Sequence, residues 1–222
     1  MEEIQGIYNI WKPLGLTSHD VVKKIRWISK VKKVGHAGTL DPGAEGVLVV
    51  CIGREYTKTI SSIANTTKEY VVGMTLGIIT DSYDREGKVI KKESVAIADD
   101  RILEIVKKYK GEQEQIPPMF SAVHHNGKRL YELARQGIEV ERAPRKITIH
   151  DIAVEKITPG DNPEVTMRVS CSSGTYIRTL CFDIGNDLGC GAFASFIIRT
   201  RVGNYNERDS ITLEEFENAH KK

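Results

Sequence analysis

Short apolar or alternating stretches recur along the chain and predict strands, because a side-chain period of two places alternate residues on one face of a sheet. The stretches are Gly6–Trp11, Val47–Ile52, Glu69–Leu76, Lys146–Ile157, Glu164–Cys171 and Ala192–Val202. The second is apolar throughout, which is typical of a strand buried on both faces. The turn at 159–162, Pro-Gly-Asp-Asn, predicts that the fourth and fifth stretches form a hairpin.

Between these stretches, apolar residues recur at the spacing of a helix. Val21, Val22, Ile25 and Ile28 share one face of a helix that we expect from an N-cap at Ser18 to about Lys30. Further helices are predicted near 57–64, from 99 or 100 to about 109, over 128–136 before Gly137, over 175–188 before Gly189, and from a capping box near Thr212. Strands and helices are mixed without strict alternation, which favours an α+β fold with a central, largely antiparallel mixed sheet flanked by helices.

The 222 residues, 40% hydrophobic and 28% charged, are ordinary for a soluble globular protein of one domain. No apolar run reaches the roughly 18 residues that span a bilayer, and the acidic start Met1–Gln5 does not resemble a signal peptide, so we expect a cytoplasmic protein. The four cysteines and six histidines are scattered without a C-x-x-C pair, which argues against a disulfide or a metal site.

The net charge of +2 excludes a protein that coats nucleic acid by basicity alone. Basic residues nevertheless gather in two places, Lys23 to Lys33 and Lys128 to Lys146. Such runs are most often solvated faces, but the first lies beside a glycine-rich segment, and this placement favours contacts with phosphate.

That segment, Gly35–Val47, holds four glycines and a proline around a single aspartate, Asp41. Glycine and proline both disfavour a helix interior, so we expect a tightly held loop that leads into the apolar strand. Asp41 precedes Pro42, which restricts its backbone to extended geometry. Taken alone, an Asp-Pro pair is most often an ordinary turn; a fixed loop can also present a catalytic side chain.

The same segment reads G-H-A-G-T-L-D-P-G-A-E-G-V and resembles the catalytic motif of the TruB-type pseudouridine synthases, the tRNA pseudouridine(55) synthases. Four other elements match that family in the same order: Ile10–Ser18, Lys68–Tyr70, Gln115–Ala122 and Ser173–Thr179. The resemblance runs from about Gly6 to Tyr205 and implies the pseudouridine synthase fold.

The reaction of that family breaks the N1–C1′ bond of a uridine, turns the base and rejoins it through C5, which requires no cofactor or metal. The resemblance assigns the essential carboxylate to Asp41, leaving open whether it attacks the base or the sugar or steers a glycal route. It assigns to Arg178 the pairing that keeps Asp41 ionised, and to Tyr70 stacking on the base and proton removal. Asp81 and Asp84 are rival carboxylates in a hydrophilic turn and are weaker candidates.

The resemblance also implies contacts with the RNA. Tyr176 and Ile197 match positions of the uracil pocket, His36 is expected at the extruded nucleotide, and Lys12 is expected to support the loop or a phosphate. The segment 124–145 matches a mobile, thumb-like insertion that closes over the T-loop, with Lys128, Arg129 and Arg135 as basic contacts. An ordinary exposed helix would have the same composition.

We therefore expect one catalytic domain over 1–222 that isomerises uridine 55 in the T-loop of tRNA, as a monomer without an obligatory protein partner or membrane contact. Many relatives continue into a PUA domain, whereas after Tyr205 this chain has room for one helix, so we expect no PUA domain. The alternatives are a guide-RNA-directed synthase subunit and a non-catalytic tRNA-folding chaperone. The presence of Asp41, Tyr70 and Arg178 favours catalysis.

Overall fold

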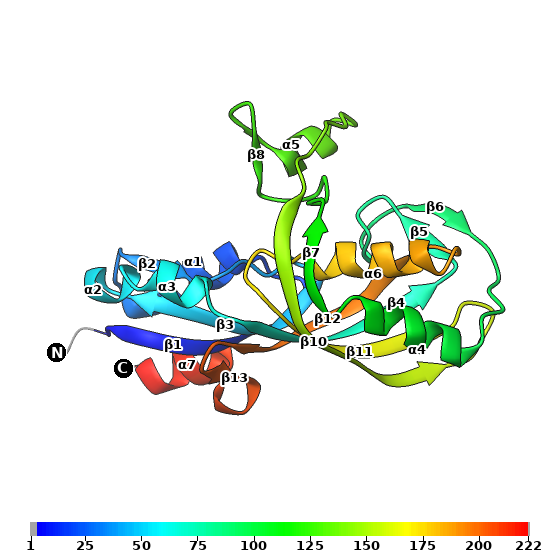
Figure 1. Ribbon diagram of the computed structural model, residues 1–222. Coiled ribbons are helices and arrows are strands. Elements are labelled where there is room, and N and C mark those ends of the chain that lie inside the picture. Colours follow the sequence, from blue (N-terminus) through cyan, green and yellow to red (C-terminus); the bar gives the residue numbers. More distant parts are fainter. Residues whose placement is uncertain (1–3, 222) are drawn as a thin grey trace. The chain divides into compact units, whose positions relative to one another are not determined.

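The computed structural model of the chain describes residues 4–221, so the acidic start at Met1–Glu3 and the terminal Lys222 lie outside the described residues. The chain packs into two compact units (Figure 1). The first combines the residues up to Val71 with those from Ile197 on, and the second is Val72–Phe196. Two strands, β4 (Lys68–Leu76) and β12 (Ala192–Val202), each run through both units. The expectation of one domain stays a prediction.

The first unit surrounds strand β3 (Ala44–Ile52). Antiparallel β1 (Gly6–Lys12) and β2 (Val34–His36) pair with β3, and the end of β12 pairs with it in parallel, with Ile197 opposite Ala44. The other elements are α1 (Ser18–Ser29), α2 (Arg54–Thr57), α3 (Ile60–Ala64), β13 (Tyr205–Asn206), the 3-10 turn Glu207–Asp209 and α7 (Leu213–His220).

Both faces of β3 are buried, as its uninterrupted apolar sequence predicts. Leu48, Val50 and Ile52 pack with α1 and α7 into one cluster, whereas Val47 and Val49 pack toward α3 on the opposite face. Residues 37–43 around Asp41, the catalytic-motif loop, precede this strand directly, so the loop is continuous with a strand that is buried on both faces.

Helix α1 begins at Ser18, one residue earlier than an N-cap at Ser18 would give. Thr17 is the N-cap and forms a capping box with Asp20. The Ser18 hydroxyl faces inward instead, donates to the Leu40 carbonyl at 3.1 Å and accepts from the Leu40 amide at 2.8 Å. The sequence prediction of Ser18 as the cap is therefore wrong by one position, because that side chain is used to hold a loop 22 residues away.

The second unit contains the predicted hairpin of β10 (Arg145–Thr158) and β11 (Glu164–Cys171), with β7 (Gly111–Gln115) antiparallel to β10. Val165, Met167, Val169 and Cys171 are fully buried, which is the period-two pattern of a strand with one core face. The remaining elements outside residues 116–144 are β5 (Ile78–Thr80), β6 (Val89–Lys92), α4 (Asp99–Lys108) and α6 (Ile177–Asp187).

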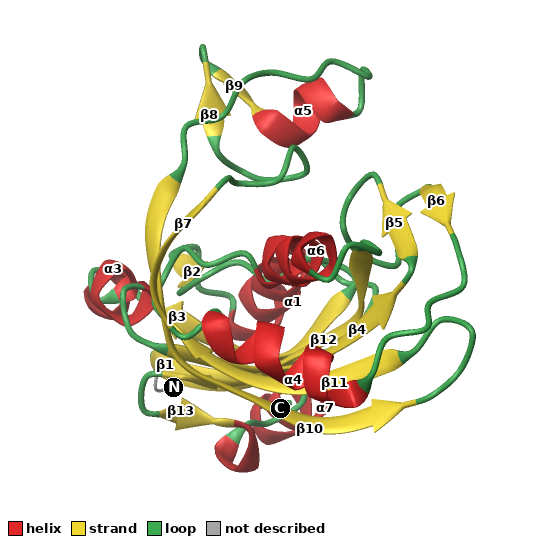
Figure 2. Cartoon of the chain, turned by 45° about the vertical axis from the view of Figure 1, so that its right-hand side comes forward, coloured by secondary structure: helices red, strands yellow, loops and turns green. Residues whose placement is uncertain are grey.

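Residues 116–144 form a projection that extends from the adjacent ends of β7 and β10, and Figure 2 shows it standing away from the helices of the second unit. It consists of a hairpin, β8 (His124–His125) with β9 (Lys128–Arg129), followed by α5 (Leu130–Ala134). The predicted basic helix over 128–136 is thus corrected: its first two residues belong to a hairpin strand. Gly127 lies directly before β9 and Gly137 follows α5, and their φ angles are 81° and 72°.

The largely antiparallel mixed sheet, the flanking helices and the inserted segment confirm the predicted α+β class. Strands β10, β11 and β12 and helix α7 lie where the sequence predicts them. Within residues 4–221, no helix is long and apolar enough to cross a membrane.

Candidate active site

Asp41 lies in a loop whose neighbouring residues are fixed on both sides. Before it, the buried Leu40 is held by the Ser18 hydroxyl of α1. After it, the Pro42 carbonyl accepts a hydrogen bond from the Gly15 amide at 2.9 Å, and the Asp41 carbonyl accepts one from the Ala44 amide at 3.1 Å. The half-buried Asp41 carboxylate is therefore carried by a backbone with little freedom, as a preorganised catalytic group requires.

Arg199 of β12 also supports the Asp41 loop. Its guanidinium is 1% exposed and donates to three carbonyls: Val47 at 2.8 Å, Thr39 at 3.3 Å and Gly38 at 3.1 Å. Arg199 is not among the site residues predicted from the sequence. An arginine directly after the apolar residues Phe196–Ile198 of a predicted strand is the signal that could have found it, because a buried charge needs several partners.

Lys12 supports the loop and does not face solvent. Its side chain is fully buried, and its ammonium donates to the carbonyls of Pro13 at 2.9 Å and Leu16 at 2.7 Å. Burial lowers the pKa of Lys12 to about 8, although the nearby Asp41 carboxylate opposes this shift. Of the two roles expected from the sequence, loop support fits this position, and a direct phosphate contact does not, because the ammonium cannot reach an external ligand.

Three further expected residues belong to the first unit. His36 ends β2, and burial, with the Arg199 guanidinium, lowers the pKa of its imidazole, which keeps the ring neutral near pH 7. Tyr70 is buried in β4, and Ile197 is buried in β12 beside the start of β3, three residues after Asp41. The structure therefore places His36, Ile197 and Asp41 on segments that flank β3.

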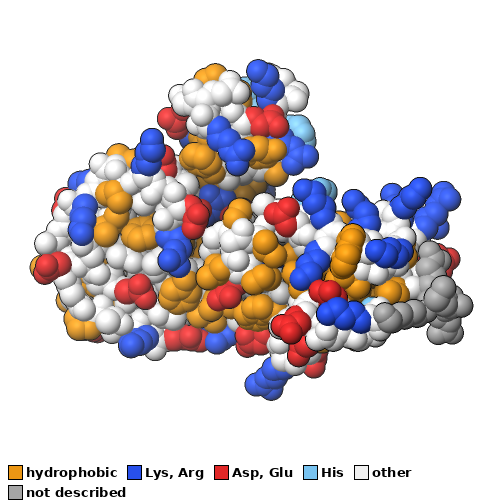
Figure 3. Space-filling view, turned by 180° about the vertical axis from the view of Figure 1, so that it is seen from behind, with side chains coloured by type: hydrophobic (Ala, Val, Ile, Leu, Met, Phe, Trp, Pro, Cys, Tyr) orange, Lys and Arg blue, Asp and Glu red, His pale blue; other side chains and the backbone are white. Residues whose placement is uncertain are grey.

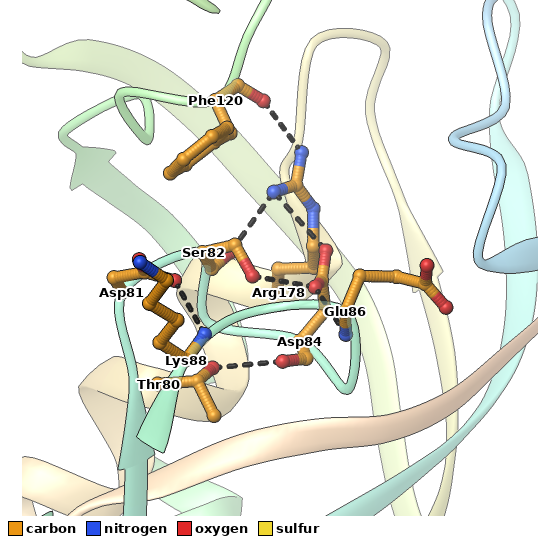
Figure 4. A network of polar contacts seen from close by, with 8 residues as sticks. All are labelled: Thr80, Asp81, Ser82, Asp84, Glu86, Lys88, Phe120 and Arg178. Atoms are coloured by element: carbon orange, nitrogen blue, oxygen red, sulfur yellow. Dashed lines mark hydrogen bonds and ion pairs between the residues drawn. The ribbon is translucent and has the colours of Figure 1, made fainter. Parts of the chain in front are cut away.

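Arg178 is at the start of α6 in the second unit, where its side chain is 4% exposed (Figure 4). Its guanidinium lies 3.3 Å from the Asp84 carboxylate and donates to the carbonyls of Ser82 and Phe120, each at 2.9 Å. Arg178 is therefore a buried arginine and not one on the solvent-exposed surface of the helix. Figure 4 shows these acceptors approaching from two loops, so the guanidinium joins the 80–88 turn to the base of the inserted segment.

Asp84 is the residue that the sequence reasoning underrated. Its side chain is 15% exposed, accepts from the Ser82 hydroxyl at 2.6 Å and the Glu86 amide at 3.0 Å, and forms the ion pair with Arg178. The expectation of a solvent-facing turn is correct for Asp81, which is exposed and accepts from the Lys88 amide at 2.9 Å. It is wrong for Asp84, because the turn folds back on α6.

Tyr176 immediately precedes α6 and is positioned by Gln115. The buried Gln115 side chain donates to the Tyr176 carbonyl at 3.0 Å and accepts from its amide at 2.8 Å. Two motifs 61 residues apart are thereby connected. The role of Gln115 is therefore to hold the backbone of Tyr176, which its neighbours in the sequence do not reveal.

The expected RNA contacts of the inserted segment remain exposed: Lys128 and Arg129 on β9, and Arg135 after α5. The Arg135 guanidinium stacks over the Tyr131 ring at 5.4 Å. At the base, Arg142 donates to the Pro117 carbonyl at 3.3 Å and so holds the two ends of the segment together. The exposed cations are available to an anionic partner, whereas Arg142 is structural.

A cavity of about 600 Å³ lies along α6, lined by Tyr83, Phe182, Asp183, Asp187 and neighbouring side chains; it contains none of the site residues predicted from the sequence. Burial and the nearby Asp187 raise the pKa of Asp183 to about 6. Among residues 4–221, no group of three or more His, Cys, Asp or Glu side chains is arranged to hold a metal ion.

Comparison with known proteins matches most of the chain to one family. Residues 26–177 match the TruB family pseudouridylate synthase N-terminal domain, and residues 178–222 match the tRNA pseudouridylate synthase B C-terminal domain. The chain is 52% identical to the tRNA pseudouridine synthase B of Clostridium acetobutylicum and 51% identical to that of Clostridium tetani. Each match covers 96% of this chain and 72% of the relative.

Solved structures agree on the fold. The chain matches a protein of a Cbf5–Nop10–Gar1 complex with a TM-score of 0.74 and 32% identity, over 96% of this chain and 54% of the other. It matches one of an archaeal box H/ACA Nop10–Cbf5 complex with a TM-score of 0.73 and 29% identity, spanning 55% of that chain. With the family match extending over more than half of its length and with these relatives, the chain belongs to the TruB family of pseudouridylate synthases.

Proposed function

We propose that this protein isomerises uridine to pseudouridine in tRNA, at uridine 55 of the T-loop. The observation that carries the proposal is the 52% identity, over 96% of the chain, to a tRNA pseudouridine synthase B. The held loop around Asp41 supports it, because isomerisation at a glycosidic bond needs a carboxylate at a fixed place.

The reaction balances within the nucleotide. The N1–C1′ bond breaks, a C5–C1′ bond forms, the proton on C5 leaves, and N1 gains a proton. In our proposal Asp41 supplies the carboxylate that promotes the bond cleavage, and the Tyr70 hydroxyl takes part in the removal of the C5 proton. Arg178 provides fixed positive charge, whose orientation Asp84 maintains within the second unit.

The inserted segment supplies the binding energy for extruding the base. Flipping a stacked nucleotide out of folded RNA costs a few kcal/mol. The exposed cations Lys128, Arg129 and Arg135 offset this cost by contacting phosphates, and the neutral His36 ring is suited to stack on or hydrogen-bond the extruded nucleotide. In this proposal Tyr176 and Ile197 are the apolar residues that contact the uracil.

The decisive experiment incubates the purified protein with unmodified tRNA transcript carrying tritium at C5 of uridine. Release of one equivalent of tritium, with pseudouridine mapped to position 55, is the expected result. A transcript with cytidine at position 55 is the matched substrate control. Asp41→Asn is expected to lower the rate more than 100-fold, a loss above about 2.7 kcal/mol, because the near-isosteric amide lacks the charge.

The alternatives predict different outcomes. A guide-RNA-directed subunit would release tritium only with an added guide RNA and protein partners. This candidate is favoured by the likeness to Cbf5 complexes, but at 32% identity it is weaker than the match to the tRNA enzymes. A folding chaperone would increase the fraction of correctly folded tRNA without releasing tritium, and Asp41→Asn would leave that activity intact.

A further inference from the structure

Helix α1 presents an unusual outward face. His19, Lys23, Trp27 and Lys30 are all exposed and are spaced by four, four and three residues, so they form one continuous stripe, the α1 stripe. The opposite face, with Val21, Val22 and Ile25, is buried in the core of the first unit. The residues of the α1 stripe therefore do not belong to the hydrophobic core.

Trp27 is the most unusual member, since 64% of this side chain is exposed. A tryptophan normally buries a large apolar area, so this exposed ring offers an uncovered aromatic face on which another ring can stack. The Lys30 ammonium lies 4.6 Å from the ring centroid, which places a cation directly beside the aromatic face. Lys23, one turn before Trp27, forms only an exposed ion pair with Asp20 at 3.6 Å, which contributes little and is readily exchanged.

Positive charge continues beyond the end of the helix. A hollow of about 450 Å³ is lined by Lys30, Lys32, Lys33 and Arg54, together with Gln5, Val31, Gly53 and the single carboxylate of Glu55. Figure 3 shows Lys and Arg side chains gathered over this part of the first unit. Four cations against one carboxylate in one hollow are complementary to a polyanion.

The stripe begins next to the catalytic-motif loop. His19 lies close enough to His36 to affect the pKa of that ring, and Ser18 contacts Leu40 directly. From Ser18, nine residues of helix reach Trp27, a distance of about 14 Å at 1.5 Å per residue. A strand that passes the Asp41 loop can therefore continue along α1, with a neighbouring nucleotide, not the target base, at Trp27.

We propose that the α1 stripe binds the RNA strand flanking the target nucleotide, with Trp27 as the stacking platform for a base and with Lys23, Lys30 and the adjacent hollow as phosphate contacts. Aromatic rings interleaved with cations are the recurrent device for holding single-stranded nucleic acid. The inference rests on the proposed function in that its partner is the substrate tRNA.

Intrinsic fluorescence gives a direct test. The chain has two tryptophans, Trp11 and Trp27, so Trp11→Phe leaves Trp27 as the sole reporter. Titration with an unmodified T-arm stem-loop, and separately with full-length tRNA transcript, is expected to quench Trp27 emission at the same RNA concentration that gives half-saturation in filter binding. RNA that binds in the filter assay without altering Trp27 emission would overturn the proposal.

Variants then separate binding from chemistry. Trp27→Ala is expected to raise Kd and KM roughly tenfold, the effect of losing one stacked base, with kcat unchanged and with most of the affinity restored in Trp27→Phe. Lys23→Ala and Lys30→Ala are each expected to reduce the slope of log K against log salt by about 0.7. Leu103→Ala, at another exposed apolar side chain, is the control and is expected to change neither value. A Trp27→Ala variant with wild-type Kd and salt slope contradicts the inference.

The two proposals fail separately. If the wild-type protein releases no tritium from tRNA but tRNA quenches the emission of Trp27, the proposed function is wrong and the α1 stripe remains an RNA-binding surface. If tritium is released and Trp27 does not respond, the stripe has no such role and the proposed function stands.

Discussion

The Arg178 guanidinium and the Asp84 carboxylate lie 3.3 Å apart, and both side chains are largely withdrawn from solvent. The pair connects the start of α6 with the 80–88 turn (Figure 4). The carbonyls of Ser82 and Phe120 also accept hydrogen bonds from Arg178, so groups from two separate loops help to orient its guanidinium. A buried ion pair of this kind adds little net free energy of folding, because desolvation of the two charges offsets their attraction. Removing one partner is nevertheless strongly destabilising, since it leaves the other charge buried and uncompensated.

Asp84→Asn is therefore expected to lower both stability and activity. The loss of unfolding free energy should lie at the lower end of the roughly 3–5 kcal/mol typical of a broken buried pair, because the amide oxygen can still accept from Ser82 and Glu86. Urea denaturation and the tritium-release rate measure the two effects. Asp81→Asn, in the same turn but exposed, is the control. Equal behaviour of the two variants would show that the ion pair does not position Arg178.

Gly46→Ala is expected to disrupt the support of the catalytic-motif loop. Gly46 has φ of 117°, and a Cβ there would lie 2.3 Å from the Arg199 carbonyl oxygen. Gly111 has the same φ of 117°, but no atom lies within 4 Å of its added Cβ. Gly111→Ala should cost only backbone strain of about 1–3 kcal/mol, and Gly46→Ala about 1–3 kcal/mol more from overpacking. Similar urea midpoints for the two variants would refute the role of the close strand approach.

Tyr70→Phe is expected to stop the reaction before product release. The ring remains, so binding and bond cleavage should proceed, whereas proton removal from C5 loses its hydroxyl. Quenched-flow sampling should therefore find a protein–RNA adduct or a detached base, with tritium release strongly slowed. Tyr131→Phe, at a half-buried tyrosine of α5, is the matched control. Near-normal tritium release from Tyr70→Phe would mean that Tyr70 only packs the site.

Asp183→Asn is expected to stabilise the protein above pH 6 and to have no effect near pH 4. Burial and Asp187 raise the pKa of Asp183 from 3.8 to about 6, so the folded state binds the proton more tightly than the unfolded state. Stability of the wild-type protein consequently falls as pH rises from about 4 to 6 and stays lower above that. Because the side chain is partly solvated, we discount the full shift and expect a gain of about 1–2 kcal/mol at pH 8.

Thermal or urea denaturation of the wild-type and Asp183→Asn proteins across pH 4–8 measures this difference. Asp187→Asn provides an internal check, because it removes the neighbouring charge while its amide oxygen can still accept from the Tyr109 hydroxyl, which lies 2.8 Å from Asp187. That variant should show a shallower pH dependence than the wild type. Parallel stability curves for all three proteins would contradict the raised pKa.

Local sequence alone determined the elements whose signals are local. The apolar run of β3, the hairpin of β10 and β11 and the Thr212 capping box were all predicted, because side-chain period and capping chemistry act within a few residues. The sequence also identified the Asp41 loop by its glycines and its motif. It overestimated the helix after Lys128, since a two-residue hairpin strand has no period to recognise.

Tertiary structure decided which groups hold that loop and which charges are buried. Ser18 and Leu40 are 22 residues apart, Gln115 and Tyr176 are 61 apart, and Arg199 and Gly38 are 161 apart. No local pattern encodes such pairs, because they form only when distant strands and helices pack together. For the same reason Lys12 and Asp84, polar residues in sequence segments that look exposed, proved to be structural partners of the site: burial is a property of the packed chain and not of a residue's neighbours in sequence.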